Sequence, residues 1–119
     1  MNELKRLSVT QTRELVTAVS RIFDIVRIVD PIVMRVIEIT PEGNLVTKSE
    51  NCYSVWRKDS RCENCISYKA CTECRRQSKC EFIGNEVYFV TSKPFMLIDN
   101  TGMEHYLTIE IVSRISDEI

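Results

Sequence analysis

The first apolar pattern along the chain is that of an amphipathic helix. Between residues 9 and 23, apolar side chains recur one, four, seven and eight positions apart, as on one face of a helix. These are Leu15, Val16, Val19, Ile22 and Phe23. Ser8 and Gln11 have the spacing of a capping box, and Thr12 and Arg13 lie on the polar side. We expect residues 1–24 to form a flanking helix that covers a sheet, with a dimerising coiled coil as the alternative.

The segments that follow have the composition and alternation of strands. Two Val- and Ile-rich runs, 25–29 and 33–39, are separated by the turn residues Asp30-Pro31 and predict a hairpin. A short extended piece is expected at 45–47, and further strands at 80–83, 87–91, 95–98 and 106–112. In the last of these, polar and apolar side chains alternate, which predicts one buried face. The chain is predicted to be α+β: some of these segments form an antiparallel sheet of about five strands, with short helices on one face and the N-terminal flanking helix.

Composition narrows the class of protein. The 119 residues are 44% hydrophobic and 28% charged with a net charge of −1, which favours a folded domain and gives no general attraction to nucleic acid or membrane. Every apolar stretch is too short for a membrane span, and Met1–Thr10 lacks the apolar core of a secretory signal. We therefore expect a cytoplasmic location, where thiols stay reduced. The charge is uneven, because residues 55–80 carry seven basic and three acidic side chains.

The six cysteines are the most informative residues for chemistry. Two C-x-x-C pairs lie five residues apart, and such pairs bring two thiolates to the separation that a tetrahedral metal requires. The candidate ligands of zinc or of an iron–sulfur cluster are Cys52, Cys62, Cys65, Cys71 and Cys74. Because structural zinc modules usually separate their pairs by about 12–20 residues, two alternatives stay open. The thiols could remain reduced and respond to oxidation, or they could form disulfides in purified protein.

The same segment carries a resemblance to a known family. Cys52-Tyr53, Trp56 and the run Cys62-Glu63-Asn64-Cys65-Ile66 resemble the cysteine-bearing PAS-like sensor domains of bacterial signalling proteins, especially those placed ahead of GGDEF diguanylate cyclase domains. Segments 25–31, 81–90 and 111–117 are similar to the first, later and final strands of that family. The resemblance implies a sensor domain over 25–119 with a Cys-rich helical insert at 50–80, often dimeric, and an output domain such as GGDEF on its C-terminal side. Cys52, Cys62 and Cys65 match the family's cysteines, whereas Cys71, Cys74 and Cys80 do not.

Other side chains add little catalytic potential. Tyr53 and Trp56 are candidates for ligand binding, although anchoring in the core is the simpler interpretation. His105 is the single histidine, so a Ser-His-Asp or Cys-His set cannot be assembled within one chain, and we expect a surface or hydrogen-bonded role for it. The chain contains no GGDEF signature and no glycine-rich phosphate loop.

These observations favour a non-enzymatic sensory or regulatory domain. A small ligand, a metal or the thiol redox state would shift its packing, and the C-terminal strand would pass the change to an output domain. The helix at 9–23 is expected to provide the contact of a homodimer. One alternative is a small domain that zinc or an iron–sulfur cluster merely staples together. Another is a thiol oxidoreductase using Cys62 and Cys65, which is disfavoured because no βαβ unit precedes the motif.

Overall fold

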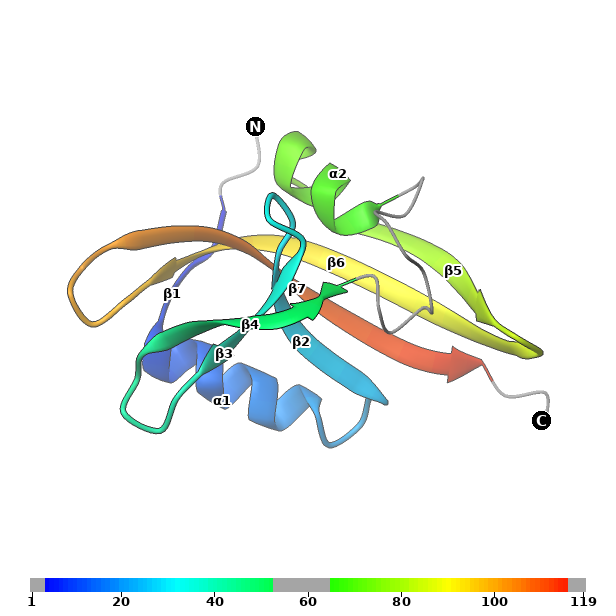
Figure 1. Ribbon diagram of the computed structural model, residues 1–119, viewed down its shortest axis with the longest axis horizontal. Helices are drawn as coiled ribbons and strands as arrows, with labels where there is room; N and C mark the ends of the chain where they lie inside the picture. Colours follow the sequence, from blue (N-terminus) through cyan, green and yellow to red (C-terminus); the bar gives the residue numbers. More distant parts are fainter. Residues whose placement is uncertain (1–3, 53–64, 116–119) are drawn as a thin grey trace.

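The computed structural model describes residues 4–52 and 65–115 (Figure 1). Its elements in chain order are β1 (Arg6–Ser8), α1 (Val9–Val19), β2 (Ile25–Asp30), β3 (Arg35–Ile39), β4 (Leu45–Asn51), α2 (Ile66–Glu73), β5 (Gln77–Ile83), β6 (Glu86–Ile98) and β7 (Glu104–Ile115). The strands form one sheet in the order β1-β6-β7-β2-β3-β4, and β5 also pairs with β6. All pairs are antiparallel except β1 with β6. The α+β class is therefore confirmed, with a seven-stranded sheet in place of the predicted five strands.

The helix expected within residues 1–24 is shorter than that range, because residues 6–8 form strand β1; α1 begins at Val9, where the apolar pattern starts, and ends before residue 23. Ser8 and Gln11 form both hydrogen bonds of the capping box. The helix stops at Val19, so Ile22 lies beyond it and is 78% exposed. The prediction for Thr12 was wrong, because this side chain is fully buried and donates to the Ser8 carbonyl at 2.7 Å. Because this hydrogen bond satisfies the Thr12 hydroxyl, threonine can lie on the buried side of the helix, where an apolar residue would be expected.

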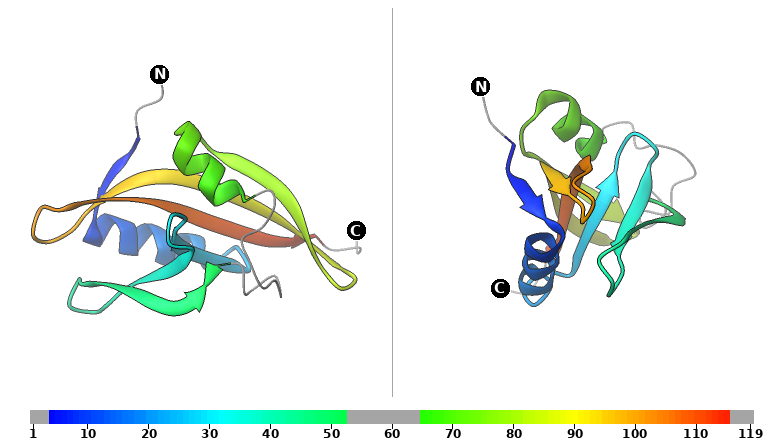
Figure 2. Two further views of the ribbon diagram at one scale, coloured as in Figure 1. Left: turned by 45° about the horizontal axis from the view of Figure 1, so that its top comes forward. Right: turned by 90° about the vertical axis from the view of Figure 1, so that its left-hand side faces the viewer.

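Figure 2 shows α1 and α2 on opposite faces of the sheet. On the α1 face lies the larger core, which comprises Val9, Ile28, Ile37, Phe95, Leu97, Leu107 and Ile109. On the α2 face, Ile66 packs with Val90 and Val112 in a smaller cluster. Strand β7 was predicted to have one buried face and has two: Leu107 and Ile109 are buried under α1, while Thr108, Glu110 and Val112 are buried on the α2 side.

Strand β6 corrects the prediction of separate strands at 87–91 and 95–98, because it runs unbroken through Pro94. The backbone N–H of Met96 donates to Lys5 beside β1, so the even-numbered residues of β6 direct their backbone groups toward the β1 and β5 edge. Strand β5 reaches only to Ser92 and β1 begins at Met96. Pro94 thus lies in the gap between these two partners, where its missing N–H costs no hydrogen bond.

The remaining elements agree with the sequence in kind and differ in extent. The hairpin of β2 and β3 is confirmed, and the Asp30 carboxylate accepts from the Ile32 N–H in its turn. Strand β4 extends to Asn51, beyond the expected end at residue 47. The insert contains a helix, α2, as expected, but β5 begins at Gln77, inside the predicted 50–80 insert. No helix among the described residues is long and apolar enough to cross a membrane.

Candidate functional site on the α2 face of the sheet

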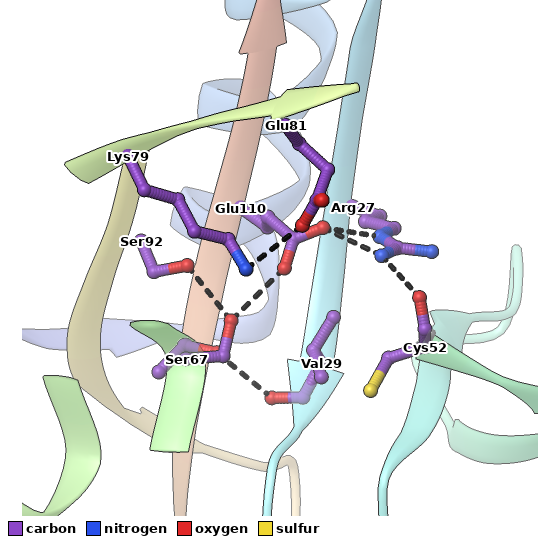
Figure 3. A network of polar contacts seen from close by, with 9 residues as sticks. Arg27, Val29, Cys52, Ser67, Lys79, Glu81, Ser92 and Glu110 are labelled. Atoms are coloured by element: carbon purple, nitrogen blue, oxygen red, sulfur yellow. Dashed lines mark hydrogen bonds and ion pairs between the residues drawn. The ribbon is translucent and has the colours of Figure 1, made fainter. Parts of the chain in front are cut away.

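A buried ion pair lies at the centre of the sheet on the side that α2 covers (Figure 3). Arg27 on β2 and Glu110 on β7 are register partners, and the guanidinium contacts Glu110 Oε1 through Nη2 at 2.6 Å and Nε at 2.8 Å. Their side chains are only 11% and 7% exposed. Arg27 also donates to the Cys52 carbonyl at 2.6 Å, at the end of β4. The pair therefore joins three strands to the beginning of the Cys-rich insert.

Two serines complete the coordination of the carboxylate. Ser67 of α2 donates to Glu110 Oε2 at 2.9 Å, and its oxygen lies 2.7 Å from the hydroxyl oxygen of Ser92 on β6. Because a hydroxyl has one proton, Ser92 must be the donor in the second contact. Both serines are buried. Each Glu110 oxygen thus has a partner, which is the condition under which a buried charge is tolerated.

The other end of α2 is attached to the same strand. Tyr106 on β7 donates its hydroxyl to the backbone carbonyl of Cys71 and lies 3.2 Å from the Cys74 sulfur. Cys74 caps the helix in the left-handed conformation, with φ of 54°. Cys74 therefore lies one position past Glu73, the last residue of the helix that contains Cys71.

The two thiols at this end of α2 differ in environment. Cys71 is buried, and its burial, with the negative charge of Asp30 and the neighbouring Cys74, raises the pKa of its thiol to about 11. Burial and the contact with Cys74 also raise the pKa of Tyr106. Cys74 is exposed. At neutral pH Cys71 is thus a protonated, slowly reacting thiol, while Cys74 is open to reagents.

The other cysteines and the remaining candidate site residues are distributed around this face or away from it. Cys52 is buried at the end of β4, and Cys65 is the N-cap residue of α2 without a side-chain cap. Cys80, on β5, is paired with Phe89 and lies on the opposite face of the sheet. Cys62, Tyr53 and Trp56 lie outside the described residues. Within 4–52 and 65–115, no group of three or more His, Cys, Asp or Glu side chains is arranged to hold a metal ion.

Sequence reasoning missed the ion pair, although one signal pointed to it. Arg27 interrupts the run Ile25-Val26-Arg27-Ile28-Val29, and a charge inside such a run needs a buried partner. His105 behaves as expected, because its Nε2 lies 2.8 Å from Asp99 Oδ2 and the ring is hydrogen-bonded.

Comparisons of the chain with protein-family models, with curated proteins and with solved structures gave no match.

Proposed function

We propose that the chain is a PAS-like sensory domain of a bacterial signalling protein, without catalytic activity of its own. A small ligand, a bound metal or a change at a thiol would act on α2 and its cysteines. Strand β7 would pass the change to an output domain, such as GGDEF, on the C-terminal side. The proposed cofactor, where the cysteines hold one, is zinc or an iron–sulfur cluster.

The observation that carries this proposal is the double attachment of α2 to β7. Ser67, in the first turn of the helix, binds Glu110, and the carbonyl of Cys71, in the last turn, accepts from Tyr106. The two β7 residues are four positions apart on one face of the strand, so the helix is tied to β7 near both of its ends. A change at Cys71 or Cys74 would move one of these ties directly.

The strand arrangement supports the family resemblance. The segments that resemble the first, later and final strands of the sensor family fall on β2, β5 with β6, and β7. In the sheet β7 lies between β2 and β6. The final strand is therefore the central one, and it leads to residue 115 at the end of the described chain.

Hydrogen exchange on protein purified without oxygen tests the proposal. Iodoacetamide under mild conditions should modify the exposed Cys74 well before Cys71, because only thiolates react and the Cys71 thiol is held protonated. We expect the modification, or added Zn²⁺, to change exchange at the β7 amides from Tyr106 to Glu110. Cys74→Ser should remove the response to alkylation. Cys80→Ser is the matched control, since Cys80 is also exposed but lies on the other face, and it should leave the response intact.

Two results would count against a sensor. Unchanged β7 exchange after both alkylation and metal addition would show that α2 and β7 are not coupled. Loss of the whole sheet on treatment with a chelator, with stoichiometric metal found by elemental analysis, would instead favour the stapled structural domain.

A further inference from the structure

Strand β5 presents an unpaired edge. It pairs with β6 on one side, and within the described part of the chain no strand lies on the other. Figure 1 shows it as the outer yellow-green strand beyond β6. An exposed edge of seven residues is long enough to pair with another strand, and proteins usually protect such edges.

The register determines which backbone groups point outward. The even-numbered residues of β6 direct their backbone toward β5, as the bond from Met96 to Lys5 on the same edge shows. Each of them is paired with an odd-numbered residue of β5. The N–H and C=O groups of Ser78, Cys80 and Phe82 therefore point away from β6, toward the free edge.

We propose that this edge binds a second copy of the chain, with the two β5 strands antiparallel about a two-fold axis at Cys80. In that register Lys79 lies opposite Glu81 of the second copy, and Glu81 lies opposite its Lys79. Within one chain these side chains already form an ion pair of 2.9 Å, 13% and 10% exposed. The dimer would set two such pairs side by side with unlike charges at the facing positions, and every residue contact would be repeated by symmetry.

The other edges do not have this self-complementarity. The central residue of β4 is Lys48, so the same operation would place two lysines opposite each other. The pairing of β4 with β3 also shifts register between Arg35 and Ile37, which distorts that edge. Strand β1 has only three residues.

Exposed apolar side chains favour the same location. Phe82 is 63% exposed and Phe89 46% exposed, and both lie on the sheet face opposite α2, near Cys80. In the dimer Phe82 would lie opposite Ser78 of the second copy and diagonal to its Cys80. Pairing would thus cover part of an apolar surface that a single chain leaves in water.

Sedimentation of the full chain over a range of concentrations gives the first test. Cys80→Pro removes an outward N–H without affecting the ladder to β6, and should weaken the dimer by at least about 100-fold. Cys80→Ser keeps that N–H and should change the dissociation constant by less than about threefold. Circular dichroism verifies that both variants are folded. A short thiol-bridging reagent should link wild-type chains covalently, and Cys80→Ser should abolish that link because the two Cα atoms of such a pair are about 5.5 Å apart.

A charge exchange gives the sharper test. The double variant Lys79→Glu/Glu81→Lys retains the pair within each chain and the attraction between identical chains, so it should dimerise like the wild type. A wild-type chain paired with a variant chain would place lysine opposite lysine and glutamate opposite glutamate. In an equal mixture of the two proteins, random exchange would make about half of all dimers mixed. Mass spectrometry should find a share of mixed dimers well below that value.

Three results would overturn the proposal. The first is a chain that stays monomeric at every concentration, and the second is a mixture that exchanges at random. The third is a dimer that Cys80→Pro leaves intact and Leu15→Glu disrupts, since Leu15 is on α1 and 40% exposed, which would place the contact on the N-terminal helix.

Discussion

Removal of the Glu110 charge should be among the most destabilising single changes in the sheet. In Glu110→Gln, Arg27 loses an ionic partner held by two contacts of 2.8 Å or less. The guanidinium stays buried, where the Cys52 carbonyl still accepts a hydrogen bond from it, and Ser67 loses a charged acceptor. Breaking a buried pair by removing one partner costs about 3–5 kcal/mol, largely because the other charge remains out of water.

Two matched variants test whether the loss of stability in Glu110→Gln comes from the buried pair or from the loss of any carboxylate. Glu38→Gln breaks the pair with Lys48, whose side chains are 56% and 42% exposed, and should cost less than about 1 kcal/mol. Replacing both buried partners, as in Arg27→Met/Glu110→Leu, leaves no unpaired charge and should recover most of the loss. Urea denaturation at pH 7, followed by circular dichroism, measures all three. A loss for Glu110→Gln no larger than that for Glu38→Gln would refute the reasoning.

Three further substitutions test the turns between strands: at Gly43 between β3 and β4, at Gly84 between β5 and β6, and at Asp99 after β6. Gly43 has φ of +88°, and a Cβ there would lie 2.5 Å from the side-chain nitrogen of Asn100, which can turn aside; because the backbone conformation itself is strained for alanine, Gly43→Ala should cost about 2 kcal/mol. Gly84, with φ of +57° and open space around it, should cost only about 1 kcal/mol when changed to alanine; equal costs in urea denaturation would contradict this. Hydrogen bonds from Thr101 and His105 hold the pKa of Asp99 below its ordinary value, so its contribution is present at neutral pH and lost as pH falls below about 4. Asp99→Asn should therefore lower the melting temperature at pH 7 and flatten its decline in acid, and parallel acid profiles would contradict the assignment.

Local signals in the sequence predicted the features that depend on neighbouring residues. The capping box at Ser8 and the turn at Asp30 are formed by side chains within three residues of the groups they bind. The strand alternation located β7 for the same reason. The lengths of β6 and β7 depend on the strands that pair with them, and those strands come from distant parts of the chain.

Pro94 and Glu110 show why the length of β6 and the buried ion pair could not be predicted from the sequence. A proline argues for a break in a strand, and here the break is absent because two strands from elsewhere leave a gap at that position. A glutamate argues for a solvent-exposed face, and here its charge is balanced by Arg27, 83 residues away. Of the predicted metal ligands that the structure describes, Cys71 and Cys74 lie at one end of α2, Cys65 lies at the other end, and Cys52 directly follows β4. The pattern of C-x-x-C spacings contains no information about that separation.

The division of the core gives a physical reason why α2 could move while the domain stays folded. The α1 face contains seven buried apolar residues, and the α2 cluster contains three. The attachment of α2 consequently combines this small cluster and the buried Ala70 and Cys71 with polar contacts through Ser67 and Tyr106. Polar contacts can be exchanged for water at a net cost of about 1 kcal/mol each, whereas opening the larger core would expose apolar surface throughout the sheet. Local opening of α2 should therefore require much less free energy than global unfolding, which is the condition that a signal at its cysteines needs in order to reach β7.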